Sequence, residues 1–208
     1  MVEVSWLLFL AASLVVIVTP GQDMVLVMSR SIGQGSRAGM ATAAGVSVGL
    51  LGHTLLATLG LGALLQASEL LFQVLKLVGA AYLVYLGLRL VRAGAPHYRL
   101  HAASTRPLPR LFLEGALSNL ANPKIALFYF AFLPQFVAAS APNPAVSLLT
   151  LGIAFAALTF LIKGPIGYGA GALAGWLRSH PAVLAWINRA SGAVLIGLGI
   201  RLAFEEHR

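Results

Sequence analysis

The sequence predicts an all-α polytopic membrane protein with about six transmembrane helices. Of its 208 residues, 59% are hydrophobic and only 10% are charged, whereas soluble domains contain roughly 25% charged residues. Three long stretches, residues 4–22, 38–68 and 125–162, contain no Asp, Glu, Lys or Arg. A spanning helix needs about 20 apolar residues, so the last stretch holds most of two spans, and Pro142-Asn143-Pro144 provides the turn between them.

Six hydrophobic segments follow one another at about residues 4–28, 38–65, 70–92, 110–138, 145–171 and 182–203. The first lacks the basic start of a secretory signal, so we expect it to be retained as a helix. We expect one transmembrane domain made of two three-helix halves, residues 1–93 and 110–208, joined by a polar cytoplasmic loop at 94–109. Residues 81–90 and 193–202, which end the two halves, are identical at six of ten positions. Because three spans are an odd number, the second copy must insert upside down, so the sequence predicts inverted repeats.

The basic residues predict the orientation, because Lys and Arg concentrate in cytoplasmic loops. If both termini lie outside, the inner side receives nine basic residues: Arg30, Arg37, Arg89, Arg92, Arg99, Arg106, Arg110, Arg178 and Arg189. The outer side receives three: Lys76, Arg201 and Arg208. Both termini are therefore expected outside a bacterial cytoplasmic membrane, although the N-terminus would lie inside if the first segment failed to cross. The net charge of +8 is a topological signal rather than a nucleic-acid-binding patch.

Two helices are interrupted at comparable places in the two halves, by Thr19-Pro20-Gly21-Gln22-Asp23 and by Asn122-Pro123-Lys124. Each resembles a helix start, with Thr or Asn as N-cap and Pro at the first helical position. Thr19 and Gln22 also have the spacing of a capping box. We expect non-helical backbone at residues 19–21 and 121–123. Broken helices inside a membrane line cavities, and their N-termini attract carboxylates; the simpler alternative is that the prolines only kink packed helices.

These interruptions give the predicted substrate-binding residues: Thr19, Pro20, Gly21, Gln22, Asp23, Asn122, Pro123 and Lys124. A charge inside a span costs at least about 2.5 kcal/mol, so such residues usually face a cavity. Asp23 is the leading proton-coupling candidate. Lys163 and Glu114 are further site candidates. Lys163 is expected either at the site or at the membrane interface, and Glu114 more readily forms a solvated or snorkelling pair with Arg110 near a membrane edge.

His53 is a second proton-coupling candidate, although a histidine on a face of small residues more often packs or donates a hydrogen bond. It continues the four-residue spacing of Ala41, Gly45 and Gly49. Such faces let helices approach closely. This face and a second one at Gly167, Gly171 and Gly175 are expected either to pack within the subunit or to form a homodimer.

Other functions have weaker support in the sequence. There is no cysteine, which excludes thiol catalysis and Cys-based metal sites, and no cofactor or metal site is expected. Gly45-x-Ser47-x-Gly49 matches the pattern Gly-x-Ser-x-Gly, but it lies inside the second hydrophobic segment rather than at a turn between a strand and a helix, and His-Glu-x-x-His is absent. An intramembrane enzyme is therefore the weaker alternative. A metal-ion or other small-solute exporter is a second alternative, but the spans offer few acidic ligands.

Several motifs resemble those of the lysine-exporter family, which includes the homoserine/threonine exporters. They are Thr19-Pro20-Gly21, Met24-x-Leu26-Val27, Ser29-Arg30-Ser31, Gly35-x-Arg37-x-Gly39, Gly79-Ala80-Ala81-Tyr82-Leu83-x-Tyr85-Leu86-Gly87, Asn122-Pro123-Lys124 and Phe132-Leu133-Pro134-Gln135-Phe136. The family's usual Pro-Gly-Pro reads Pro20-Gly21-Gln22 here. The resemblance implies efflux of amino acids or related small zwitterions, generally driven by proton antiport.

Overall fold

A computed structural model describes residues 4–19, 21–67, 69–92, 105–137 and 141–204. These residues are almost entirely helical, and their one β contact is an isolated bridge between Val4 and Val137. The helices run in the order α1 (Trp6–Val18), α2 (Gln22–Gln34), α3 (Ser36–Ala67), α4 (Glu69–Arg92), α5 (Leu108–Leu120), α6 (Pro123–Leu127), α7 (Pro144–Ser179) and α8 (Pro181–Phe204). A π-helical turn, η1 (Phe128–Phe132), and a 3-10 turn, η2 (Leu133–Phe136), continue α6.

The same succession of elements occurs twice along the chain. A broken helix is followed by a long helix and then by a third helix: α1–α2, α3 and α4 in the first part, and α5–α6, α7 and α8 in the second. The axes of α1 and α2 differ by 53°. The six hydrophobic segments expected from the sequence are therefore helical over most of their described residues, and the first and fourth are interrupted by the two breaks. Most of the predicted polar loop, residues 93–104, lies outside them.

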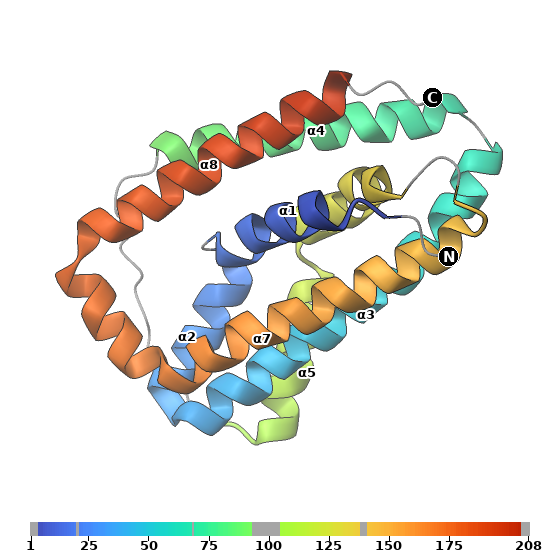
Figure 1. Ribbon diagram of the computed structural model, residues 1–208. Helices are drawn as coiled ribbons and strands as arrows, with labels where there is room; N and C mark the ends of the chain where they lie inside the picture. Colours follow the sequence, from blue (N-terminus) through green and yellow to red (C-terminus); the bar gives the residue numbers. More distant parts are fainter. Residues whose placement is uncertain (1–3, 20, 68, 93–104, 138–140, 205–208) are drawn as a thin grey trace.

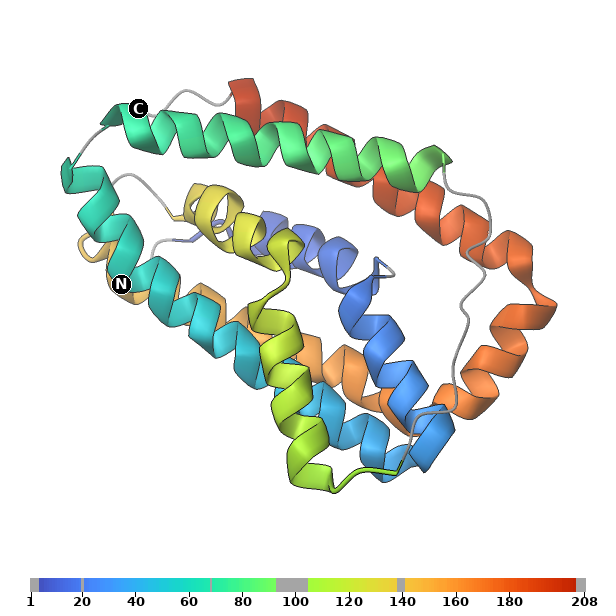
Figure 2. The same ribbon diagram turned by 180° about the vertical axis from the view of Figure 1, so that it is seen from behind.

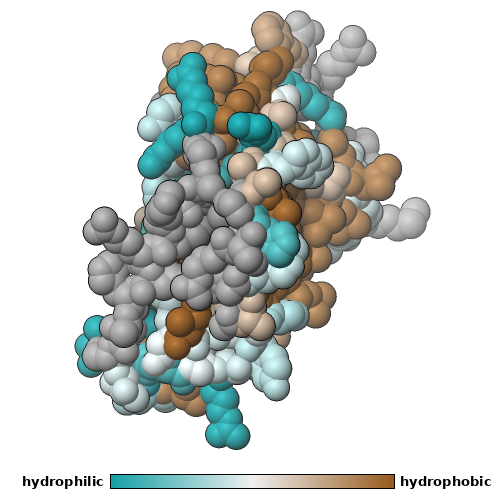
Figure 3. Space-filling model, turned by 90° about the vertical axis from the view of Figure 1, so that its left-hand side faces the viewer, coloured by the Kyte–Doolittle hydropathy of each residue, from teal (hydrophilic) through white to brown (hydrophobic). Residues whose placement is uncertain are grey.

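Length and composition qualify three helical stretches to cross a membrane: Ser36–Gly60 in α3, Pro144–Ala170 in α7 and Ala185–Phe204 in α8. The bent pair α1–α2 makes a fourth if it counts as one span. Exposed side chains agree with a lipid environment, because Leu7, Leu59 and Phe204 are 85%, 74% and 81% exposed. Figure 3 shows hydrophilic side chains at both the top and the bottom of the view and a largely hydrophobic flank on its right. The fold is that of an all-α polytopic membrane protein.

The helices form two layers with the broken helices between and beside them (Figures 1 and 2). Helix α3 packs along α7, and α4 packs along α8 as a separate pair. Helix α1 and the turns η1 and η2 lie between these two pairs, and α2 and α5 pack against the α3–α7 pair. Both helix breaks therefore lie in the middle of the molecule, facing the α4–α8 pair.

Glycines allow the closest of these helix contacts. A methyl group on Gly39 would overlap the carbonyl of Gly167, and one on Gly45 would overlap the carbonyl of Phe112. A methyl group on Gly49 would lie 2.6 Å from the carbonyl oxygen of Ala116. The small-residue face of α3 is thus covered by α5 and α7 within the subunit. The side-chain surroundings of Gly171 and Gly175 lie outside the described part of the structure.

Candidate functional site

At the first helix break, α2 begins without a side-chain cap on its N-terminus. Thr19 ends α1, and its hydroxyl donates to the carbonyl oxygen of Val15. Gly21, with extended backbone, is the N-cap of α2, which begins at Gln22. The predicted capping box between Thr19 and Gln22 is therefore wrong. The Thr19 hydroxyl is already bonded to the preceding turn, which is a common alternative for Ser and Thr, and Gln22 Nε2 donates to Ser118 Oγ over 3.0 Å. Pro20 lies outside the described residues.

The second helix break has the predicted helix start. Asn122 is the N-cap of α6, and its side-chain oxygen accepts a hydrogen bond from the Lys124 backbone N–H over 3.1 Å. Pro123 occupies the first helical position, where its missing N–H costs nothing. Non-helical backbone at Ala121 and Asn122, and at Thr19 and Gly21, confirms the two interruptions. The expectation was wrong for Pro123, which is helical, because its ring fixes φ at a value that suits the first residue of a helix.

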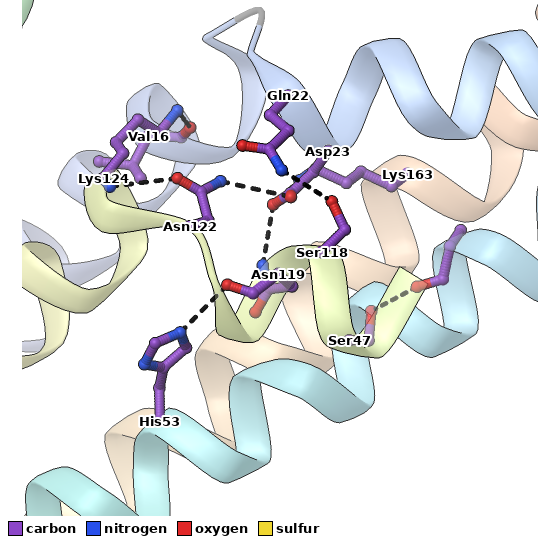
Figure 4. Close-up of polar contacts among 11 residues, drawn as sticks. Val16, Gln22, Asp23, Ser47, His53, Ser118, Asn119, Asn122, Lys124 and Lys163 are labelled. Carbon is purple, nitrogen blue, oxygen red and sulfur yellow. Dashed lines mark hydrogen bonds and ion pairs between the residues drawn. The ribbon is translucent and has the colours of Figure 1, made fainter. Parts of the chain in front are cut away.

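Asp23 connects the two breaks. It sits in the first turn of α2, is 3% exposed, and accepts hydrogen bonds from Asn119 Nδ2 at 2.8 Å and Asn122 Nδ2 at 3.3 Å. Lys163 Nζ of α7 lies 3.3 Å from Asp23 Oδ2, the oxygen that Asn119 also contacts. The two side chains form an ion pair, and both are almost fully buried. Figure 4 shows these groups converging on Asp23 from three different elements. Such a pair is tolerated away from water only when further hydrogen bonds satisfy the carboxylate, and the two amides do so.

The two lysines of the site have different partners. Lys163, which the sequence placed either at the site or at the interface, belongs to the site and pairs with Asp23. Lys124 Nζ instead donates to the carbonyl oxygen of Val16, at 3.0 Å, on the far side of the first break (Figure 4). A methyl group on Gly21 would lie 3.7 Å from the same ammonium. Lys124 therefore bridges the start of α6 to the end of α1 and the start of α2.

A cavity of about 440 Å³ adjoins these residues. It lies between the two breaks and the α4–α8 pair. Its walls are Thr19, Gly21, Gln22, Asp23, Met24, Tyr82, Leu86, Arg89, Leu90, Asn122, Pro123, Lys124, Lys163 and Leu195. Every predicted substrate-binding residue that the structure describes thus lines one cavity.

His53 and Glu114 lie outside this lining. His53 of α3 is 2% exposed, stacks on Tyr129 with ring centroids 5.5 Å apart, and places Nε2 3.2 Å from the carbonyl oxygen of Asn119. It therefore reaches Asp23 only through Asn119. Glu114 pairs with Arg30 at 2.9 Å and Arg110 at 3.5 Å, and also with Arg106. The expected pair with Arg110 is confirmed, and Glu114 joins α2 to α5 rather than entering the site.

Sequence reasoning missed Asn119, Tyr82 and Arg89 at the site. Asn119 had a detectable signal, because it is a polar residue three positions before Asn122 and therefore lies close to the second break. Tyr82 and Arg89 had none, because no pattern in α4 indicates which of its residues faces the other layer. Arg89 was interpreted only as part of the topological charge count and of the repeat at residues 81–90.

The breaks of the two interrupted helices meet at a charged, partly polar cavity inside an apolar helical shell. This is the architecture of a membrane transporter. The chain belongs to the LysE type translocator family, whose pattern matches residues 14–206.

Two named relatives are efflux proteins. The homoserine/homoserine lactone efflux protein of Salmonella typhimurium is 34% identical over 203 residues, covering 97% of each chain. The leucine efflux protein of an Enterobacter species is 28% identical over 196 residues, covering 94% of this chain and 93% of the relative. An uncharacterized membrane protein of Vibrio cholerae is 32% identical over 201 residues, covering 95% and 96%. No solved structure matches the chain significantly.

Proposed function

We propose that this protein exports amino acids from the bacterial cytoplasm and binds them in the cavity between its two helix breaks. The observation that carries the proposal is the buried Asp23 carboxylate beside a cavity that also contains Lys124 and Lys163. A zwitterion needs an acceptor for its ammonium group and donors for its carboxylate. Asp23 provides the acceptor, and Lys124 with the free backbone N–H groups at the start of α2 provides the donors.

Asp23 also fits the role of the proton-coupling group in an antiport cycle. Its three hydrogen-bond or ion-pair partners leave part of its acceptor capacity open, since a carboxylate accepts about four hydrogen bonds. A proton bound to Asp23 would remove the charge that attracts both Lys163 and the substrate ammonium. Proton binding and substrate binding would then be mutually exclusive at one carboxylate, which is the requirement for exchange. His53, linked through Asn119, is the alternative proton carrier.

The site favours an organic zwitterion over the other solutes considered. Among the described residues, no group of three or more His, Cys, Asp or Glu side chains is placed to hold a metal ion. A metal-ion exporter would have to bind its cargo with Asp23, a single carboxylate already paired with Lys163. We also propose that the protein is not an enzyme, because its named relatives are efflux proteins.

We propose that the chain lies in the cytoplasmic membrane with both termini outside, in two inverted halves at 1–93 and 110–208. The repeated order of broken, long and third helix supports the inverted halves, and the nine-to-three charge count supports the orientation. Since the described glycines of α3 pack internally, a homodimer would have to use another surface, such as the α7 face at Gly171 and Gly175.

The orientation has a direct test in reporter fusions. A reporter that is active only outside the cytoplasm is expected to be active after Arg208 and inactive between Pro96 and Pro107, because the basic residues around that loop hold it inside. A cytoplasm-active reporter at the same two positions serves as the control and should give the opposite result. Activity of the first reporter in the loop would reverse the proposed orientation.

The exporter function is tested by loading cells with dipeptides and measuring which amino acid appears outside. Cells that contain the protein are expected to release at least one amino acid several-fold faster than cells without it. Cells producing Asp23→Asn at the same membrane level are the matched control, and their release should equal that of cells without the protein. Equal release of every amino acid by all three strains would refute the exporter proposal.

A further inference from the structure

The cavity contains more positive than negative charge. Three cations line it, Lys124, Lys163 and Arg89, against one carboxylate, Asp23, and its other lining residues are uncharged. The other acidic residue with a described side chain, Glu114, is paired with arginines elsewhere. Two positive charges at the cavity therefore have no carboxylate partner in the described part of the protein.

The geometry identifies these two charges. Lys163 is neutralised by Asp23 at 3.3 Å. Among the described residues, the acceptor of the Lys124 ammonium is a carbonyl oxygen, that of Val16. Arg89 lies one turn before the end of α4, is exposed, and forms no ion pair with any described residue. At the partly buried Lys124 an unpaired cation is costly, and an anionic group of a ligand removes that cost.

The uncharged lining shows what kind of side chain fits beside these cations. Met24, Leu86, Leu90 and Leu195 contribute apolar surface on the walls formed by α2, α4 and α8, and Tyr82 adds an amphipathic ring. An apolar or hydroxylated substrate side chain can be buried there favourably. A side chain ending in an ammonium or guanidinium group would find no free carboxylate among the described lining residues, of which Asp23 is the one acidic residue.

We propose that the cavity admits amino acids whose side chains carry no positive charge, with Lys124 binding the carboxylate and Arg89 excluding basic substrates at the cavity edge. This proposal rests on the exporter function above and specifies its substrate class. Arg89 acts as a specificity residue, because a guanidinium at the entrance repels a cationic side chain and attracts a carboxylate. Like charges close together in a poorly screened cavity repel strongly enough to discriminate between substrates.

The test is competition against the export substrate in proteoliposomes that contain the purified full-length protein. Exchange of labelled leucine or homoserine is measured in the presence of unlabelled leucine, lysine or arginine. The wild type is expected to be inhibited by leucine at concentrations at least about tenfold below those of lysine or arginine, a difference of about 1.4 kcal/mol. Arg89→Glu is expected to reduce that discrimination by about tenfold, because it reverses the charge. Arg89→Gln is expected to reduce it by less, because it only removes the charge.

Arg92→Glu is the matched control. Arg92 lies on the same last turn of α4 but does not line the cavity, so its reversal should leave the discrimination as in the wild type. Equal inhibition by lysine and leucine in the wild type, with exchange intact, would overturn the proposed substrate class while leaving the exporter function standing. Unchanged discrimination in an Arg89→Glu protein that still exchanges leucine would overturn the role of Arg89. Failure to exchange any amino acid would instead refute the exporter function, and the substrate class with it.

Discussion

Asp23→Asn is expected to abolish export driven by a pH gradient while leaving the protein in the membrane. Asparagine keeps the size of the side chain and its fit to the start of α2, but it cannot hold a proton or carry the charge that Lys163 faces at 3.3 Å. Removing one partner of a buried ion pair costs about 3–5 kcal/mol. The measurement uses right-side-out vesicles that are preloaded with the amino acid. Its release is followed after the external medium is made acidic.

A second variant separates loss of coupling from loss of folding. In Asp23→Asn with Lys163→Met, the unpaired charge is gone, so thermal stability should recover toward that of the wild type. Proton-driven export should remain absent, because the titratable group is still missing. Full proton-driven export by a well-expressed Asp23→Asn protein would show that Asp23 only stabilises the start of α2 through the helix dipole. The coupling role would then pass to His53.

The sequence predicted the fold well because hydrophobic length and charge spacing are local properties. The charge-free stretches located the helices, and Asn122-Pro123 located one helix start correctly, since an Asn N-cap followed by Pro satisfies local hydrogen bonding wherever the helix lies. Thr19 failed as a cap for an equally local reason. Its hydroxyl had a nearer acceptor in the carbonyl of Val15, within the turn that it ends.

The partners inside the site could not be predicted because they come from distant parts of the chain. Asp23 and Lys163 are separated by 140 residues, and only the packing of α2 on α7 brings them together. The sequence predicted Lys124 at the site and left Lys163 either there or at the interface, and three-dimensional packing pairs Lys163 with the Asp23 carboxylate and Lys124 with the carbonyl of Val16. Arg89 was hidden for the same reason, since its role depends on how α4 faces the helix breaks.

Lys124→Met is expected to weaken substrate binding by about 10- to 100-fold, because hydrogen bonds to charged groups contribute about 1.5–3 kcal/mol. Methionine fills a similar volume beside Val16 and Gly21 but offers no donor to a carboxylate. The proposed site would retain the backbone N–H groups of α2 and the Asp23 carboxylate, so binding should weaken rather than disappear. The measurement is equilibrium binding of the exported amino acid, identified from loaded cells, to the purified protein in lipid nanodiscs.

Lys76→Met is the control for this measurement, which tests most directly whether the paired helix breaks form the substrate site. It removes the same ammonium group from a buried lysine of α4 that does not line the cavity. The predicted result is wild-type affinity for Lys76→Met and at least about tenfold weaker binding for Lys124→Met, a difference of about 1.4 kcal/mol. Wild-type affinity in a correctly folded Lys124→Met protein would contradict the account, because the substrate carboxylate would then be bound somewhere other than between the two breaks.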